Sequence, residues 1–265
     1  MNANFFYLKK LIFFLLLFVQ VFISVAQKNR YAYSVQKMGS PFNIVLYADT
    51  KQIADSAAQE SFKLVDSINL ICSDYDSSSE LFKLRYAAVG APIKLSPILF
   101  ELIYIAKGAY KDADGSFDIT VGPLSGLWRN ARKSQQFPTN AAINEARKRI
   151  GFNKVQLDSG AQTITFLHPS MQLDMGAIAK GYAADKVLAL LKSRGITTAL
   201  VDAGGDMVGA GMPPQKKGWT IGINVPGQQE KLLERKLVLS NKAVATSGDA
   251  FQFMLHEGIK YGHII

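Results

Sequence analysis

Charged and glycine residues that could bind an anion gather between Asp174 and Asp206. Asp174 precedes a glycine-containing turn, Lys180 lies at the start of a predicted helix, and Gly204-Gly205 follow an apolar run. Backbone N–H groups at a helix start, with an ammonium group nearby, suit a phosphate or diphosphate. A glycine pair after a strand is also a common structural turn, and a lysine near a helix start is often only solvated. The residues alone leave both interpretations open.

The hydrophobic pattern of the same stretch predicts the elements that position these residues. Apolar residues recur at helical spacing between residues 179 and 194, and Gly195 follows as a C-terminal stop. Residues 198–202 then form an apolar run that is typical of a buried strand. We therefore expect a helix that begins near Lys180, then a strand, then the glycine-rich turn.

The rest of the chain mixes helical and strand patterns. Further helices are predicted over residues 51–72, 97–111 and 139–150. Ile53 and Ile105 are placed on the buried faces of the first two. Strands are predicted over residues 31–35, 42–47, 154–157, 163–167, 219–225, 237–239 and 242–246. Because helices and strands do not alternate strictly, and no internal repeat is found, the expected fold class is α+β.

Six sequence blocks occur in a fixed order along the chain. They are Met38-Gly39-Ser40, GSFDITVGPL at 115–124, LDMGAIAKGYAADK at 173–186, VDAGGD at 201–206, AVATSGD at 243–249 and His263-Ile264-Ile265. In this order they resemble the ApbE family of FAD:protein FMN transferases, over residues 31–265. The resemblance implies an α+β, two-lobed domain with its nucleotide site in the crevice.

The resemblance also implies a reaction. Family members move FMN from FAD onto a Thr or Ser hydroxyl of an acceptor protein and release AMP. Such a transfer needs alignment of the hydroxyl with the phosphorus and neutralisation of oxygen charge, for which Mg²⁺ is the expected metal cofactor and FAD the substrate. Two alternatives stay open: a pyrophosphatase that splits FAD into FMN and AMP, and a non-catalytic flavin-binding protein.

Carried over by motif, the resemblance implies a set of site residues. The nucleotide contacts are Met38, Tyr75, Ser116, Phe117, Asp118, Asp174, Lys180 and Ile265. The backbone carbonyl of Ala177 is expected to bind the metal. His263 is the candidate base for the acceptor hydroxyl, because an unperturbed histidine accepts a proton near neutral pH. Ser247 and Asp249 are weaker candidates.

The sequence departs from the family pattern at its end. Family members continue beyond His-Ile-Ile with an Asp-Pro…Thr-Gly segment, and then with an Asp and a Thr that supply side-chain metal ligands. The printed chain stops at Ile265. The resemblance therefore implies that these ligands lie beyond residue 265 and that the family's C-terminal segment is missing. Either the gene record is incomplete, or the protein is truncated and is unstable or inactive.

The first residues carry an export signal. Lys9 and Lys10 precede the apolar run 11–19, and Ser24-Val25-Ala26 is a small-residue cleavage site. We expect residues 1–26 to be a signal peptide, residues 27–265 to be the flavin transferase domain, and the protein to be periplasmic. An uncleaved leader would instead hold it at the inner membrane.

Composition limits the partners. The net charge is +9, but lysines and arginines are spread along the chain, so neither a nucleic-acid partner nor binding to a membrane surface is expected. Cys72 is the only cysteine, which excludes an internal disulfide. The chain has no Asp-Gly-x-Thr-x-Ala motif and is not expected to flavinylate itself; its acceptor is expected to be an exported electron-transfer subunit.

Overall fold

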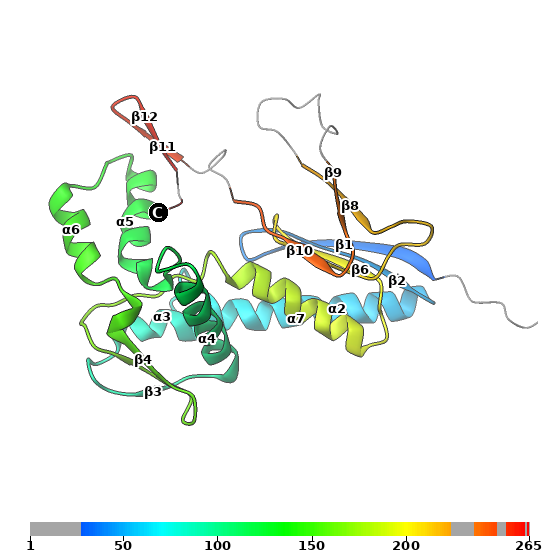
Figure 1. Cartoon of the computed structure of the whole chain (residues 1–265), viewed down its shortest axis with the longest axis horizontal. Coiled ribbons are helices and arrows are strands. Elements are labelled where there is room, and N and C mark those ends of the chain that lie inside the picture. The colour runs from blue at the N-terminus through cyan, green and yellow to red at the C-terminus, as the bar shows by residue number, and fades with distance from the viewer. Residues whose placement is uncertain (1–27, 224–235, 248–252, 263, 265) are drawn as a thin grey trace, which may run out of the picture.

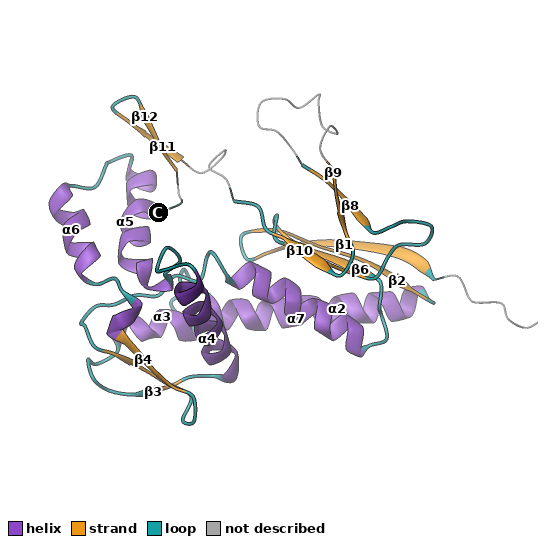
Figure 2. Ribbon diagram, viewed as in Figure 1, coloured by secondary structure: helices purple, strands orange, loops and turns teal. Residues whose placement is uncertain are grey.

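A computed structural model describes residues 28–223, 236–247, 253–262 and 264. It has two parts: a five-stranded sheet covered on one face by two helices, and a second group of helices with a small sheet of its own (Figure 1, Figure 2). This mixture confirms the α+β fold class. One hydrophobic core runs through both parts.

The main sheet is antiparallel throughout and has the strand order β1-β2-β6-β7-β10. Its strands are β1 (Asn29–Lys37), β2 (Ser40–Ala48), β6 (Ala199–Ala203), β7 (Met207–Ala210) and β10 (Lys242–Val244). Alternate residues of β2 are buried, as expected for a strand with one covered face. The antiparallel pairing of β2 with β6 brings Ser40 and the Gly204 turn to the same end of the sheet.

Helices α2 (Lys51–Cys72) and α7 (Ala179–Ser193) cover this sheet (Figure 1). The Thr50 hydroxyl caps α2 by accepting a hydrogen bond from the Ile53 N–H. The prediction that Ile53 is buried was wrong: the side chain is 43% exposed, because the buried stripe of α2 begins at Ala54. The prediction that Ile105 is buried was also wrong, because the core face of its helix runs through Leu102 and Ala106.

The second group of elements follows α2. It comprises α3 (Glu80–Lys83), η2 (Leu84–Tyr86), β3 (Ile93–Lys94), α4 (Pro97–Asp112), η3 (Ile119–Val121), α5 (Gly122–Ser134), α6 (Asn140–Lys148), η4 (Phe152–Lys154), β4 (Val155–Asp158) and β5 (Thr163–Phe166). The strands form a small sheet in the order β3-β5-β4. Helix α5 was not predicted, and it supplies several residues of the candidate site.

Two hairpins complete the described chain. They are β8 (Trp219–Gly222) with β9 (Lys236–Leu239), and β11 (Phe253–His256) with β12 (Ile259–Gly262). The second hairpin contacts α5, because the Trp128 indole donates a hydrogen bond to the Gly262 carbonyl at 2.7 Å. Among the described residues, no helix combines the length and the apolar character that a membrane span needs.

Candidate functional site

Asp174 lies at the centre of a polar cluster between α5 and the loop after α2. Ser125 donates a hydrogen bond to Asp174 Oδ2 at 2.5 Å, and the Gly176 N–H donates to Oδ1 at 2.7 Å. One guanidinium nitrogen of Arg129 lies 3.8 Å from Oδ2, and the other forms an ion pair with Asp74. We call Asp74, Ser125, Arg129 and Asp174 the Asp174 cluster.

Burial and neighbouring charges alter the acid–base properties of this cluster. Burial raises the pKa of Asp74, the negative charge of Asp174 raises it further, and Arg129 opposes both. Burial works to lower the pKa of Arg129, but the hydrogen bond with Tyr75 and the charges of the two aspartates outweigh it and raise that pKa. Arg129 therefore remains a cation between two carboxylates.

Tyr75 stands at the solvent side of the cluster. Its side chain is 76% exposed, and the Arg129 guanidinium lies over its ring at 4.5 Å from the centroid. A cation over one face orients the ring, and the exposed ring remains available for stacking on a base. The predicted contact with a nucleotide is therefore compatible with the position of Tyr75.

The segment of residues 116–118 reaches the same place. Asp118 caps η3 by accepting a hydrogen bond from the Thr120 N–H at 2.8 Å. The Asp174 N–H donates to the Ile119 carbonyl at 2.8 Å, which joins the two segments. The Ser116 N–H donates to the Ala113 carbonyl, and Phe117 is half-buried against the core. The predicted nucleotide contacts of Ser116, Phe117 and Asp118 stay predictions.

A second group of polar residues surrounds the glycine turn after β6. Gly204 and Gly205 have φ angles of 73° and 105°, in the region that favours glycine. A Cβ on Gly204 would overlap the Ser40 hydroxyl and would lie 3.4 Å from Lys180 Nζ. We call Ser40, Lys180, Gly204 and Asp206 the Lys180 cluster.

Ser40 is the unusual member of the Lys180 cluster. Its hydroxyl oxygen is the one buried side-chain polar atom in the described parts of the chain that has no hydrogen-bond partner. Buried polar atoms are nearly always paired, so this hydroxyl, which lies with Lys180 Nζ around the Gly204 turn, is a candidate hydrogen-bond donor to a bound ligand. The neighbouring Met38 is half-buried and has a φ of 50°.

Asp206 brings a carboxylate to the Lys180 cluster. Burial raises its pKa, while the charge of Lys180 and a hydrogen bond with the Thr246 backbone oppose the rise and Asp202 adds to it. The ammonium group of Lys180 therefore lies close enough to Asp206 to affect its ionisation. A cation, a buried hydroxyl and tight glycine backbone together suit the oxygens of a diphosphate.

Residues 174–180 connect the two clusters. The carbonyl of Met175 accepts hydrogen bonds from the N–H groups of Ile178 and Ala179, which forms the turn into α7. Ala177 is exposed in this turn, between Asp174 and Lys180. The predicted residues of this stretch, Asp174, Ala177 and Lys180, are all at least partly exposed.

Three predicted residues, His263, Ile265 and Asp249, lie outside the described residues. Ser247 is described and exposed. The described segments contain no group of three or more His, Cys, Asp and Glu side chains that could hold a metal ion.

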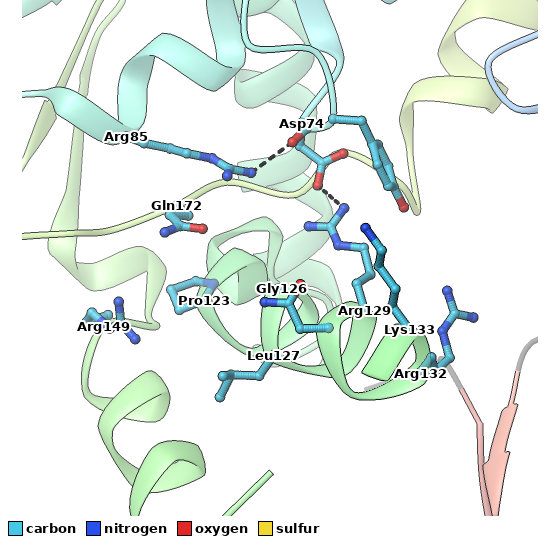
Figure 3. A pocket seen from close by; sticks show the side chains of 12 residues that line it. Asp74, Arg85, Pro123, Gly126, Leu127, Arg129, Arg132, Lys133, Arg149 and Gln172 are labelled. Atoms are coloured by element: carbon cyan, nitrogen blue, oxygen red, sulfur yellow. Dashed lines mark hydrogen bonds and ion pairs between the residues drawn. The ribbon is translucent and has the colours of Figure 1, made fainter. Parts of the chain in front are cut away.

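A pocket of about 620 Å³ adjoins the Asp174 cluster (Figure 3). Its lining comprises Asp74, Tyr75, Arg85, Pro123, Gly126, Leu127, Arg129, Asn130, Arg132, Lys133, Arg149 and Gln172. Tyr75 and Arg129 therefore belong both to this pocket and to the surroundings of Asp174. Figure 3 shows side chains from α5, from the loop after α2 and from the end of α6 around it.

Sequence reasoning missed Asp74, Ser125, Arg129 and the pocket. Two of these residues lie on α5, whose glycines and proline conceal the helical pattern. A signal was nevertheless present, since Pro123 near the start and basic residues in the last turn are typical of a helix. No local sequence pattern indicated that Asp74 belongs to the site, because its partner Arg129 lies 55 residues away in the sequence.

Comparison with known proteins identifies the family of this chain. The profile of the ApbE family matches residues 38–265. An FAD:protein FMN transferase of Klebsiella pneumoniae is 31% identical over 89% of this chain and 71% of its own length. One of Treponema pallidum is 30% identical over 79% of the chain and 62% of its own length. The chain thus spans about two thirds of the length of these relatives.

Solved structures show the same fold. The ApbE protein of Thermotoga maritima superposes with a TM-score of 0.79 at 27% identity, over 89% of this chain and 76% of that protein. The flavin transferase ApbE of Vibrio cholerae has a TM-score of 0.77 at 26% identity, over 90% and 76%. With the profile match over most of its length, this chain belongs to the ApbE family.

Proposed function

We propose that this chain is an FAD:protein FMN transferase, which moves FMN from FAD to a threonine or serine hydroxyl of an acceptor protein and releases AMP. The observation that carries the proposal is the unpartnered Ser40 hydroxyl beside Lys180 at the Gly204 turn. Such a group gains a partner when a diphosphate oxygen binds there. The named relatives, which are FAD:protein FMN transferases, support the same assignment.

The two clusters divide FAD between them in this proposal. Lys180 and Ser40 bind the diphosphate, while Tyr75 stacks on the adenine and Asp174 contacts the nucleotide. The remaining proposed nucleotide contacts are Met38, the segment of residues 116–118, and Ile265. Binding of FAD at both clusters fixes the phosphorus that the acceptor hydroxyl attacks, which is the main requirement of a phosphoryl-type transfer.

Magnesium is part of the proposal. Mg²⁺ prefers hard oxygen ligands in octahedral geometry, so the Ala177 carbonyl and the FAD diphosphate are suitable donors. Bound there, the ion would neutralise charge on the phosphate oxygens and on the leaving AMP. The chain's own contribution is the exposed turn that presents this carbonyl between Asp174 and Lys180.

His263 acts as the base in this proposal. It accepts the proton of the acceptor hydroxyl while the new oxygen–phosphorus bond forms to FMN and the bond from that phosphorus to the AMP oxygen breaks. The hydroxyl is a poor nucleophile at neutral pH, and general-base assistance contributes about 10²–10⁴-fold in such reactions. The adjoining Gly262 is tied to α5 through Trp128.

We further propose that the reaction takes place after export. The leader formed by residues 1–26 supports a periplasmic location or attachment to the inner membrane. The acceptor is then an exported protein with a flavinylation threonine or serine, and an electron-transfer subunit fits that description.

Product analysis tests this function. FAD is incubated with the chain and Mg²⁺, with and without an acceptor domain, and the products are separated by chromatography. AMP release that depends on acceptor and yields a fluorescent acceptor supports transfer. Equal FMN and AMP without acceptor indicate a pyrophosphatase, and FAD binding without AMP indicates a flavin-binding protein.

A further inference from the structure

The pocket beside the Asp174 cluster is strongly cationic. Five of its lining residues are basic: Arg85, Arg129, Arg132, Lys133 and Arg149. One lining residue, Asp74, is acidic, and its carboxylate is already paired with Arg129. Figure 3 shows Arg85, the basic side chains of α5 and Arg149 around the pocket, on three separate parts of the chain. A pocket with this charge favours an anionic occupant.

Three of the basic residues have charges that no described carboxylate neutralises at ion-pair distance. Arg85 donates to the backbone carbonyl of Asp74, and Arg149 donates to the backbone carbonyl of Glu145. Lys133 forms no ion pair with any described carboxylate. Lys133 and Arg149 lie near helix C-termini, where the helix dipole favours a cation. The helix dipoles do not explain why both residues line the same pocket.

Gly126 is part of the pocket lining and has no side chain to occupy the pocket. It lies in the middle of α5, where glycine is less favourable than alanine by about 1 kcal/mol. A Cβ at this position would meet nothing within 4 Å, so close packing does not explain the glycine. The missing side chain instead leaves room in the pocket.

Asn130 and Gln172 add uncharged amide groups to the lining. A side-chain amide both donates and accepts, which matches the backbone of a bound peptide. Tyr75 and Arg129 extend the lining to the Asp174 cluster, which the proposed function places against the bound nucleotide. A polypeptide segment bound in the pocket would therefore lie next to the nucleotide from which FMN is transferred.

We infer that this pocket binds an acidic segment of the acceptor protein and thereby positions its hydroxyl-bearing residue. The inference rests on the proposed function and adds how the acceptor is selected. Guanidinium and ammonium groups bind the aspartate and glutamate side chains of that segment, and the amides bind its backbone. The positive net charge of the whole chain assists the encounter.

Charge reversal at the pocket tests the inference. The variant Lys133→Glu/Arg149→Glu is compared with Lys63→Glu/Lys192→Glu, which makes the same change in net charge on exposed positions of α2 and α7 outside the pocket lining. The probe is a short fluorescein-labelled peptide with a central threonine flanked by aspartate and glutamate. A second peptide carries asparagine and glutamine instead. Binding is measured by fluorescence anisotropy with FAD present.

The inference predicts that the pocket variant weakens binding of the acidic peptide at least about tenfold, and that the control pair changes it less than about twofold. Gly126→Leu, which fills the pocket without a change of charge, should weaken binding as well. The affinity for FAD alone should stay within about twofold in all variants, because none of the three altered pocket residues belongs to the proposed nucleotide contacts.

Other results would overturn the inference. Equal losses in the pocket and control variants would show a general charge effect. If the neutral peptide bound as tightly as the acidic peptide, the pocket would not select its ligand by charge. If inorganic phosphate bound in a pocket-dependent way and the acidic peptide did not bind, the pocket would be a site for small anions. AMP release from FAD by the unmodified chain is measured in parallel, so failure of the transferase proposal is seen separately from failure of acceptor docking.

Discussion

Ser125 donates a hydrogen bond to Asp174 across 49 residues of sequence, with 2.5 Å between Oγ and Oδ2. The bond joins α5 to the turn that leads into α7, and Asp174 contacts Ser125, the Gly176 N–H and the Arg129 guanidinium. Asp174 is therefore held in one orientation before any nucleotide binds. Pre-orientation of this kind reduces the entropy lost on binding.

Ser125→Ala should weaken FAD binding by about tenfold, because Asp174 loses its pre-orientation and its side chain must then be ordered when FAD binds. Quenching of flavin fluorescence measures the affinity. Ser67→Ala is the control, since Ser67 is an exposed hydroxyl on α2 that donates only to its own helix. An unchanged affinity in Ser125→Ala would contradict the role given to this bond.

Ser40→Ala should have opposite effects on stability and on binding. Removal of an unpartnered buried hydroxyl should leave the ligand-free protein equally stable or more stable by up to about 1 kcal/mol. The same change should weaken FAD binding, because it removes a donor to the diphosphate. Urea denaturation and FAD titration measure the two quantities; lower stability with unchanged FAD affinity would refute the assignment of Ser40.

Two glycines of α5 should respond in opposite directions to alanine. At Gly122 a Cβ would lie 2.5 Å from the Gln172 carbonyl oxygen, so Gly122→Ala should destabilise the fold by about 2–3 kcal/mol. At Gly126 a Cβ meets nothing within 4 Å, so Gly126→Ala should stabilise it by about 0.5–1 kcal/mol. Thermal unfolding of both variants checks the pair, and equal effects would contradict the placement of α5.

Cys72 should be unreactive in the folded protein. Burial raises the pKa of its thiol from 9.0 to about 12, and Glu80 contributes to the rise. At pH 8 the native thiol is therefore almost wholly protonated, and the thiolate is the reactive form. Because the folded pKa is raised, this group favours the folded state below pH 9 and progressively loses that contribution as the pH rises toward 12.

A thiol-reactive dye measures this directly, because Cys72 is the only cysteine. Labelling at pH 8 should be slow in the native protein and complete in urea. Fast stoichiometric labelling of the native protein would show that the end of α2 is not packed as described.

Local signals predicted the elements that depend on them. Helices α2 and α4 begin where they were predicted, beside the capping hydroxyls of Thr50 and Ser96, because N-cap chemistry involves only neighbouring residues. The buried faces were misplaced by one position at Ile53 and Ile105, since periodicity alone does not fix which stripe meets the sheet. The position of a stripe is decided by tertiary packing.

The sequence pointed to some residues of the candidate site and not to others. Motifs indicated Asp174 and Lys180, which lie in the two polar clusters. Arg129 could not be predicted, because its importance depends on two carboxylates that are distant in sequence and near in space. The cationic pocket could not be predicted for the same reason, because Arg85 and Arg149 are distant in sequence and line one pocket only in the folded chain.

The most direct test of the account is intact mass spectrometry of an acceptor domain after incubation with FAD, Mg²⁺ and this chain. The account predicts an acceptor whose mass increases by one FMN group at a threonine or serine, together with an equal amount of AMP, and no such increase when His263→Ala replaces the unmodified chain. An unmodified acceptor in the presence of bound FAD would contradict the transferase assignment.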